Sequence, residues 1–299
     1  MTPPAGLPVT VVVATRNRWP DLARSLPRHE APVVVVDNAS DDGSADRVAA
    51  RFPDVRLSRL PANHGAVARN LGVLLAETPY VAFADDDSWW APGALARAAE
   101  HFERYPRLAL LAARMVVEPG HRDDPVSALM RESPLGREAD LPGPSVLGFL
   151  ACGAVVRRSA FLDAGGFDDV VFFRGEEERL ALDLAALGWG LAYDDDLQAH
   201  HEPSVQRDTG GADALSARND VLTAVMRRPW PVVARTVRDV ARRGPAGRAG
   251  VAQAVPRVPR ALRHRRRLPA HVESARCRLD GPPVPGPRLT PGAAGTRPA

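Results

Sequence analysis

The sequence contains no lysine, and all 39 of its basic side chains other than histidine are arginines. Residues 203–299 carry 19 arginines against six acidic residues, whereas residues 1–202 carry 20 against 30. Alanine and proline are also abundant, so the arginine content is typical of a biased genomic base composition. Arginine number alone is therefore weak evidence for a nucleic-acid partner, and no nucleic-acid recognition motif supports one.

Cysteine is nearly absent, and long apolar runs are missing. Cys152 and Cys277 are far apart in the sequence, which excludes a disulfide framework and a CxxC metal site. No apolar run approaches the roughly 20 residues that a transmembrane helix needs, and the N-terminus lacks the basic and apolar regions of a signal peptide. We therefore expect a cytoplasmic protein, with peripheral contact at the inner face of the plasma membrane as a further option.

Two common nucleotide-binding motifs are also missing, since neither GxGxxG nor GxxxxGK[ST] follows an early strand. What the first hundred residues do contain is a series of buried-strand patterns at 9–13, 32–36 and 80–84. Helical patterns at 20–28, 44–52 and 67–77 lie between them, with a further short strand pattern near 55–58. This alternation predicts an α/β fold with a Rossmann-like, mainly parallel sheet flanked by helices.

Polar segments follow three of these strands directly: Thr15-Arg16-Asn17, Asp37-Asn38 and Asp85-Asp86-Asp87. In open α/β sheets ligands bind beyond the carboxyl ends of the strands, so the three segments should converge on one crevice. Three adjacent carboxylates repel one another unless a cation lies among them. Mg²⁺ and Mn²⁺ combine carboxylates with substrate phosphates, so the triplet predicts a nucleotide-diphosphate site.

Six segments, taken in order from about Leu7 to Glu202, resemble family 2 glycosyltransferases with the GT-A fold. They are residues 11–18 (VVVATRNR), 35–44 (VVDNASDDGS), 63–72 (NHGAVARNLG), 83–87 (FADDD), 165–168 (GGFD) and 175–178 (GEEE). The resemblance implies an inverting enzyme that moves a sugar from a nucleotide-diphosphate donor to a hydroxyl acceptor. A cell-envelope glycan, a glycolipid or a small metabolite would each fit as the product.

The resemblance also implies roles for the polar residues that bind the donor nucleotide. Thr15, Arg16 and Asn17 would border the base, and Asp37 with Asn38 would hydrogen-bond the base or ribose. For Asp37 the alternative is a turn former, because carboxylates in such turns also bond the backbone. Arg69 would lie near the donor phosphates, where a guanidinium binds in bidentate fashion; the alternative is an ion pair with Asp37 or the triplet.

For the divalent cation, Mg²⁺ or Mn²⁺, the resemblance assigns Asp85 and Asp87 as ligands, with Asp85 also near the ribose. Asp86 is either a spacer or a further contact to the nucleotide sugar. His200 is predicted as the third ligand, with a surface histidine as the alternative for both His200 and His201. An imidazole ligand would favour Mn²⁺ over Mg²⁺.

A second acidic cluster at 176–178 opens the helix predicted over 176–187. The resemblance aligns Glu177 with the general base that deprotonates the acceptor hydroxyl, and Glu176 is its competitor. A carboxylate within hydrogen-bond reach suits that role. The structural alternative is that acidic side chains are favoured at any helix N-terminus by the helix dipole.

The chain is predicted to comprise a glycosyltransferase domain (1–212), a basic helical region (213–268) and a disordered Pro/Gly-rich tail (269–299). Residues 119–145 should form a loop or lid-like insertion. The basic region has the composition of segments that lie on anionic lipid, which would suit a lipid-linked acceptor. The alternative is a solvated basic face.

Two other functions remain open at the level of sequence. A sugar-nucleotide nucleotidyltransferase would also use paired aspartates and Mg²⁺, although it should carry a glycine-rich basic loop that residues 14–17 do not supply. A non-catalytic, membrane-associated protein that binds nucleotide sugars is the second. Both acidic clusters are intact, which favours the enzyme.

Overall fold

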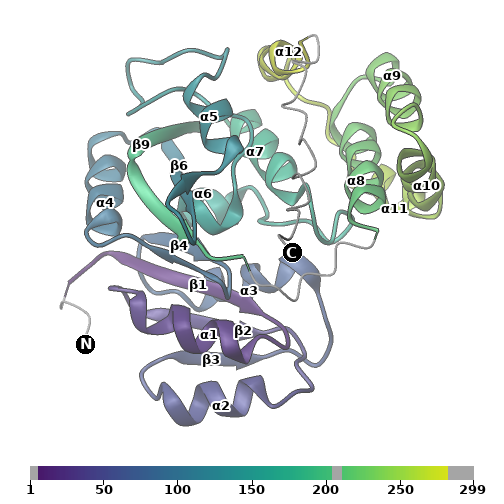
Figure 1. Ribbon diagram of the computed structural model, residues 1–299. Coiled ribbons are helices and arrows are strands. Elements are labelled where there is room, and N and C mark those ends of the chain that lie inside the picture. Colours follow the sequence, from purple (N-terminus) through teal and green to yellow (C-terminus); the bar gives the residue numbers. More distant parts are fainter. Residues whose placement is uncertain (1–5, 204–210, 282–299) are drawn as a thin grey trace, which may run out of the picture.

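The computed structural model describes residues 6–203 and 211–281 (Figure 1). Over this part of the chain the strands form one nine-stranded sheet in the order β3-β2-β1-β4-β8-β6-β9-β5, with β7 paired to β6. The strands are β1 Val9–Thr15, β2 Val33–Asp37, β3 Arg56–Arg59, β4 Tyr80–Ala84, β5 Ser88–Trp90, β6 Leu108–Val117, β7 Arg122–Asp123, β8 Ala154–Arg157 and β9 Gly190–His201.

Helices flank this sheet and then continue into a separate C-terminal group. The flanking helices are α1 Trp19–Ser25, α2 Ser44–Arg51, α3 Ala68–Leu75, α4 Ala94–Arg104, α5 Pro125–Arg131, α6 Arg158–Asp163 and α7 Glu176–Ala186. The C-terminal helices are α8 Ala212–Arg227, α9 Trp230–Ala241, α10 Pro245–Ala254, α11 Val258–Arg263 and α12 Ala270–Leu279. The predicted insertion at 119–145 holds β7 and α5 within otherwise irregular chain.

The predicted α/β fold is therefore confirmed, and its parallel pairing holds for the first four strands. β1 pairs in parallel with β2 and β4, and β2 pairs in parallel with β3. Beyond β4 the pairing is mixed, because β8 runs antiparallel to both β4 and β6 while β9 runs parallel to β6. The sheet thus has a regular parallel half and a mixed half.

The core lies on both faces of the sheet, because side chains along a strand alternate in direction. In β1, Val11 and Val13 belong to one apolar cluster, with Leu22 of α1 and Phe102 of α4. Val12 belongs to the other, which includes residues from α3, α6 and α7. A strand buried on both faces explains why the sequence reads as a continuous run of valines rather than an alternating one.

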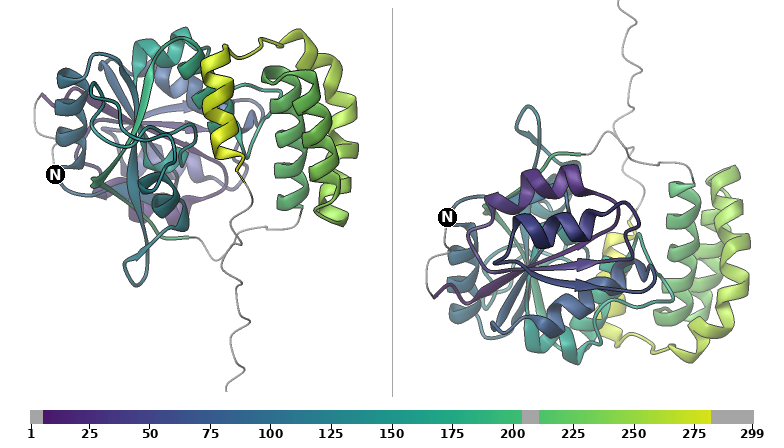
Figure 2. Two further views of the ribbon diagram at one scale, coloured as in Figure 1. Left: turned by 90° about the horizontal axis from the view of Figure 1, so that it is seen from above. Right: turned by 90° about the horizontal axis from the view of Figure 1, so that it is seen from below.

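The C-terminal helices α8–α11 stand beside the sheet domain, and α12 returns to pack on it (Figure 2). Arg227 of α8 donates to Asp183 of α7 at 2.5 Å, and Arg228 donates to Glu273 of α12 at 2.8 Å. These two buried arginines are thus used in ion pairs that hold the C-terminal helices to α7 and to one another.

The prediction of a disordered tail from residue 269 is wrong for the described residues 269–281, which include α12. Val272 is buried against Leu147 and Leu182, and Arg276 donates to Glu178 of α7 at 2.7 Å. These few contacts suffice to hold a short helix that has little apolar character of its own. The remainder of the predicted tail, 282–299, lies outside the described residues.

Asp168, the last residue of the GGFD segment, fastens the C-terminal helices to the sheet domain. Its carboxylate is 6% exposed and accepts a bond from Arg179 of α7 at 3.0 Å. It also lies 3.0 Å from His264 Nδ1, just beyond α11. Burial alone would raise the pKa of Asp168, but Arg179, the backbone N–H of Val170 and His264 together hold it below the usual value.

We expect Asp168→Ala to lower the free energy of unfolding by about 3 kcal/mol, because it leaves the buried guanidinium of Arg179 short of a partner. Asp169→Ala is the matched control: its carboxylate is 45% exposed and pairs with Arg260 on the surface, so its loss should cost under about 1 kcal/mol. Urea unfolding of the two variants measures the difference. Equal losses would contradict the anchoring role of Asp168.

Candidate active site

A cleft of about 460 Å³ lies at the carboxyl ends of β1, β2 and β4. The three polar segments that follow these strands meet here, because parallel strands end at the same edge of a sheet. Its lining is mostly polar and charged and includes Thr15, Arg16, Arg18, Asn38, Asn63, Arg69, Asp85, Asp86, Asp87, Phe172, Phe173 and Arg174. Seven of the residues predicted to bind donor or metal line the cleft.

At the rim of the cleft, the loops after β1 and β2 are clamped together by their own side chains. Asn17 donates through Nδ2 to Asp41 at 2.8 Å and accepts from the Asp41 backbone N–H at 2.9 Å. Arg16 donates to the carbonyl of Ala39 at 3.3 Å. Asn17 has a left-handed backbone with φ of 56°, a conformation that asparagine adopts more readily than most residues. These contacts show Asn17 and Arg16 shaping the rim.

Asn38, at the end of β2, also joins two loops through its side chain. Its amide nitrogen donates to the carbonyl of Gly65 at 3.1 Å, and its amide oxygen accepts from the His64 backbone N–H at 2.8 Å. Asn38 therefore holds the loop before α3 against the end of β2. This loop carries the NHGAVARNLG segment, so its tight geometry places Arg69 at the floor of the cleft.

Asp37 and Thr15 end their strands side by side in the sheet register. Thr15 is buried and its hydroxyl donates to Asp86 Oδ2 at 3.1 Å. Asp37 is 3% exposed; its Oδ2 accepts from the Ser40 backbone N–H at 3.1 Å. Among the described residues, Asp37 Oδ1 is buried without a hydrogen-bond partner. A buried acceptor of this kind costs free energy unless a ligand donor fills it.

The aspartate triplet is electrostatically strained as it stands. Burial, together with repulsion from Asp85 and Asp87, raises the pKa of Asp86 to about 8. Asp87 is buried, and its backbone carbonyl accepts from the Glu202 N–H at 2.9 Å, whereas Asp85 is about one-third exposed. Three carboxylates of this kind suit a divalent cation, which would relieve the repulsion that raises the pKa of Asp86.

Arg69 joins the triplet to the second acidic cluster. Its guanidinium is buried and donates to Asp85 Oδ1 at 2.6 Å, while its other terminal nitrogen lies 3.7 Å from Glu176 Oε1. One arginine therefore touches both the end of β4 and the start of α7. Of the alternatives that the sequence left open, the structure shows the ion pair with the triplet, and Arg69 also lines the cleft.

Glu176 and Glu177 differ in environment although they are neighbours at the start of α7. Glu176 is 2% exposed and faces Arg69. Its pKa is raised to about 8, mainly by burial and to a smaller extent by the neighbouring charge of Glu177. Glu177 is half-buried, and burial raises its pKa against the lowering effects of backbone N–H groups and Arg69. Glu176 is thus buried beside Arg69, which leaves Glu177 as the more accessible of the two side chains.

His200 does not lie beside the triplet, and its prediction as a metal ligand there is corrected. His200 Nδ1 lies 3.1 Å from Glu118 Oε1, and its ring stacks on Trp89. The neighbouring His201 is the one that faces the triplet, with Nε2 at 3.3 Å from Asp87 Oδ1. Adjacent residues of a strand point to opposite faces, so a shift of one position along β9 moves the imidazole to the other side.

One wall of the cleft is held in place by a contact that the sequence did not indicate. Phe172, Phe173 and Arg174 form this wall, and Phe172 and Arg174 have left-handed backbones with φ of 71° and 67°. The side-chain amide of Asn219, buried in α8, donates to the carbonyls of Phe173 and Arg174 at 2.7 and 2.5 Å. The C-terminal helices therefore position part of the cleft, a connection that no sequence motif indicated.

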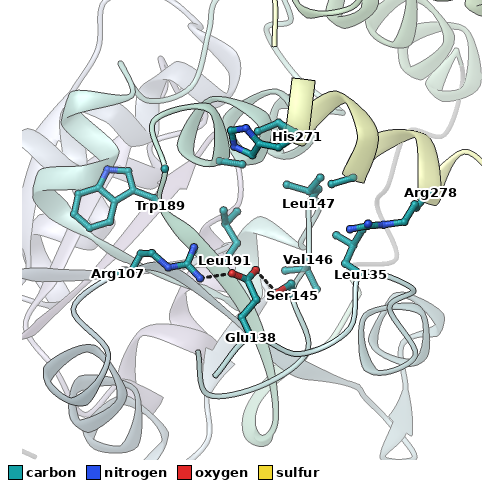
Figure 3. Close-up of a pocket in the computed structure, with 15 residues that line it drawn as sticks. Arg107, Leu135, Glu138, Ser145, Val146, Leu147, Trp189, Leu191, His271 and Arg278 are labelled. Atoms are coloured by element: carbon teal, nitrogen blue, oxygen red, sulfur yellow. Dashed lines mark hydrogen bonds and ion pairs between the residues drawn. The ribbon is translucent and has the colours of Figure 1, made fainter. Parts of the chain in front are cut away.

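A second cavity of about 180 Å³ lies between α12 and the sheet domain (Figure 3). Leu135, Leu147 and Leu191 line it, and none of the predicted site residues does. The guanidinium of Arg107 at its edge donates to Glu138 and to Asp140, so its charge is already balanced. This cavity therefore shares no residue with the predicted site.

Within residues 6–203 and 211–281, every helix is too short or too polar to cross a bilayer.

Known proteins resemble this chain in sequence. The family model described as Glycosyl transferase family 2 matches residues 10–165. The pre-mycofactocin glycosyltransferase of Mycobacterium tuberculosis is 34% identical over 218 residues, which cover 68% of this chain and 45% of that relative. The chain thus spans about half the length of that relative. An N-acetylglucosaminyl-diphospho-decaprenol L-rhamnosyltransferase of the same organism is 29% identical over 249 residues, covering 70% of this chain and 80% of that protein.

The fold is also similar to that of solved glycosyltransferases. The mannosyltransferase PcManGT from Pyrobaculum calidifontis, solved in complex with GDP-Man and Mn²⁺, superposes with a TM-score of 0.56 at 21% identity. The match covers 93% of this chain and 76% of the mannosyltransferase. The GT-A fold predicted from the six segments is therefore confirmed.

Proposed function

The chain belongs to glycosyl transferase family 2; from this we propose that it is a glycosyltransferase, which moves a sugar from a nucleotide-diphosphate donor to a hydroxyl acceptor with inversion at the anomeric carbon. Family membership weighs against a nucleotidyltransferase and against a non-catalytic binding protein.

The observation that carries the proposal is the bridge made by Arg69. Its contacts of 2.6 Å to Asp85 and 3.7 Å to Glu176 connect the triplet, which lines the cleft, to the start of α7, whose glutamates are not among the residues that line it. A donor held at the triplet and a base at the start of α7 would then act on the same anomeric carbon. Had the clusters lain on different faces of the molecule, neither could have served the other.

For the donor, Asp37 offers its unpartnered Oδ1 to a ring N–H or a ribose hydroxyl. Thr15 and Asn38 shape the neighbouring surface, and Arg16 and Asn17 set the rim. The diphosphate would lie between the triplet and Arg69, whose guanidinium can turn from Asp85 to phosphate oxygens once a cation neutralises that carboxylate. Asp86 accepts the hydrogen bond of Thr15 and would add negative charge to the same site once a bound cation lowers its pKa.

Asp85 and Asp87 would hold the divalent cation, Mg²⁺ or Mn²⁺. When bound, the cation acts as a Lewis acid that stabilises the charge on the departing diphosphate. Carboxylate oxygens are ligands that both ions accept, and the strained triplet fits such a group. The histidine nearest to this site is His201, at 3.3 Å from Asp87.

Glu177 is proposed as the general base, with Glu176 holding Arg69 in place. The Glu177 carboxylate would take the proton from the acceptor hydroxyl as its oxygen forms a bond to the anomeric carbon. The bond between that carbon and the diphosphate oxygen breaks in the same step, on the opposite face of the sugar. The raised pKa of Glu177 makes it a stronger base once it is deprotonated.

A lipid-linked acceptor is supported by the name of the rhamnosyltransferase relative, which refers to a decaprenol-linked substrate. The match covers 80% of that relative's length. Arg263, Arg266 and Arg267, exposed near the end of α11, would suit contact with anionic lipid. That contact stays a prediction, as does the assignment of the acceptor.

A thermal-shift panel of nucleotide-diphosphate sugars, each with and without Mn²⁺, tests the proposed donor class. A ligand that binds the native state at 100 times its Kd should stabilise the protein by about 2.7 kcal/mol. We expect one group of nucleotides to raise Tm only when Mn²⁺ is present. If no nucleotide sugar shifts Tm under either condition, the proposed donor site is wrong.

A further inference from the structure

A second group of metal-ligating side chains lies away from the triplet, on the loop after β6 and on β9. It consists of Glu118, His121 and His200, whose ligand atoms all lie within 4.8 Å of one another. Glu118 Oε1 is 3.0 Å from His121 Nδ1 and 3.1 Å from His200 Nδ1. Two imidazoles thus converge on a single carboxylate oxygen.

These distances are close to those of a tetrahedral metal site. Zn²⁺ binds imidazole nitrogen and carboxylate oxygen at about 2.0–2.1 Å, which places neighbouring ligand atoms of a tetrahedron about 3.3 Å apart. The two measured nitrogen–oxygen separations are slightly shorter, so a cation could enter by a small outward movement of the exposed His121 ring. That side chain is 76% exposed and free to make this movement.

The sheet holds the other two ligands in place. Glu118 directly follows β6, and its backbone N–H donates to the carbonyl of His201 in β9 at 2.8 Å. His200 is paired with Trp89 of β5 in the register, and the two rings stack with centroids 5.4 Å apart and planes 7° from parallel. Arg28 in turn lies over the Trp89 ring at 3.9 Å. The imidazole of His200 is therefore fixed in orientation before any ion binds.

The turn after Glu118 directs His121 back towards the strand. Gly120 and His121 both have positive φ, 109° and 48°, and β7 then pairs antiparallel with β6. The turn is therefore tight enough for two ligands to come from positions three residues apart. The third ligand comes from a strand about 80 residues further along the chain.

We propose that Glu118, His121 and His200 form a second divalent-cation site, of the zinc type, that fastens the loop after β6 to β9. Two imidazoles and one carboxylate are a ligand set that zinc accepts, with the fourth position left to water. The triplet offers three carboxylates beside the one imidazole of His201, and a set dominated by oxygen ligands suits Mg²⁺ or Mn²⁺. The two sites should thus select different ions. The inference does not depend on the proposed glycosyl transfer.

The test is a Zn²⁺ titration of the metal-free full-length chain in competition with a chromophoric chelator, with excess Mg²⁺ present to occupy the triplet. We expect wild-type protein to bind one Zn²⁺ per chain and His121→Ala to bind it at least tenfold more weakly. His121 is exposed, so its replacement should leave the fold intact, which circular dichroism and Tm would verify.

His271→Ala and Asp85→Asn are the controls, one removing an exposed histidine elsewhere and one altering the triplet. Both should keep the wild-type Zn²⁺ affinity within twofold. Co²⁺ in place of Zn²⁺ should give the strong visible absorption of a tetrahedral site in wild type and lose it in His121→Ala. Equal Zn²⁺ affinities for wild type and His121→Ala, or loss of binding in Asp85→Asn, would overturn the proposal.

Discussion

Replacing Glu177 with glutamine is expected to lower kcat by about 10²–10⁴-fold while leaving donor affinity close to that of the wild type. Glutamine keeps the size of the side chain but cannot accept the proton of the acceptor hydroxyl. The donor should still bind, because its proposed contacts come from the strand ends. Steady-state kinetics with a binding measurement for the donor separate the two effects.

The pH dependence of kcat/KM gives a second test of Glu177 as the base. Burial raises the pKa of Glu177, and the base works only when deprotonated, so wild-type kcat/KM should fall as pH drops through that raised pKa. The acidic limb of the pH profile, where kcat/KM falls, should therefore lie above the usual titration range of glutamate. In Glu177→Gln the residual activity should lose this limb.

Glu178→Gln is the matched control, one residue further along α7. Its carboxylate accepts from Arg276 at 2.7 Å and so faces α12 rather than the cleft. Its replacement should leave kcat within a fewfold of the wild-type value. If Glu178→Gln loses turnover and Glu177→Gln keeps it, the base has been assigned to the wrong residue.

Asp87→Asn is expected to lower kcat/KM at least about 100-fold, because cation catalysis contributes several kcal/mol to stabilising charge in the transition state. The substitution removes one negative charge from a buried position while keeping the shape of the side chain. Raising the Mn²⁺ concentration should restore part of the activity, since the remaining ligands still bind the ion weakly. Initial rates measured as a function of Mn²⁺ concentration give both quantities.

Asp46→Asn serves as the control for this change. Asp46 is an exposed aspartate that pairs with Arg59 on the surface, at 2.7 Å. Its loss should alter neither kcat/KM nor the Mn²⁺ requirement. An Asp87→Asn protein with wild-type rates at every Mn²⁺ concentration would contradict a catalytic cation at the triplet.

The strand ends could be predicted from the sequence because their chemistry is local. Continuous apolar runs identify strands buried on both faces, and the polar residues that follow each run must lie at the sheet edge. The sequence alone is therefore enough to place Thr15, Asp37 and the triplet together. It does not indicate the loop clamps made by Asn17 and Asn38, since a polar loop residue has the same sequence signature whether it holds a ligand or a neighbouring loop.

Contacts between distant segments could not be predicted in the same way. Arg69 and Glu176 are more than 100 residues apart in the sequence, and no motif around either residue indicates that the two are in contact. The assignment of His200 was wrong because successive residues of a strand point to opposite faces of the sheet. The sequence does not show which of the two adjacent histidines of β9 points towards the triplet. The role of Asp168 depends on His264, whose position follows from the packing of α8, α9, α10 and α11.

The central claim is that a divalent cation at the triplet binds the donor diphosphate in the cleft that Glu177 serves. Calorimetric titration of a nucleoside diphosphate into wild-type protein, Glu177→Gln and Asp87→Asn, each with and without Mn²⁺, tests it most directly. Binding should require Mn²⁺, persist in Glu177→Gln and weaken sharply in Asp87→Asn. Equal affinity in all three proteins, or affinity that ignores the ion, would contradict the claim.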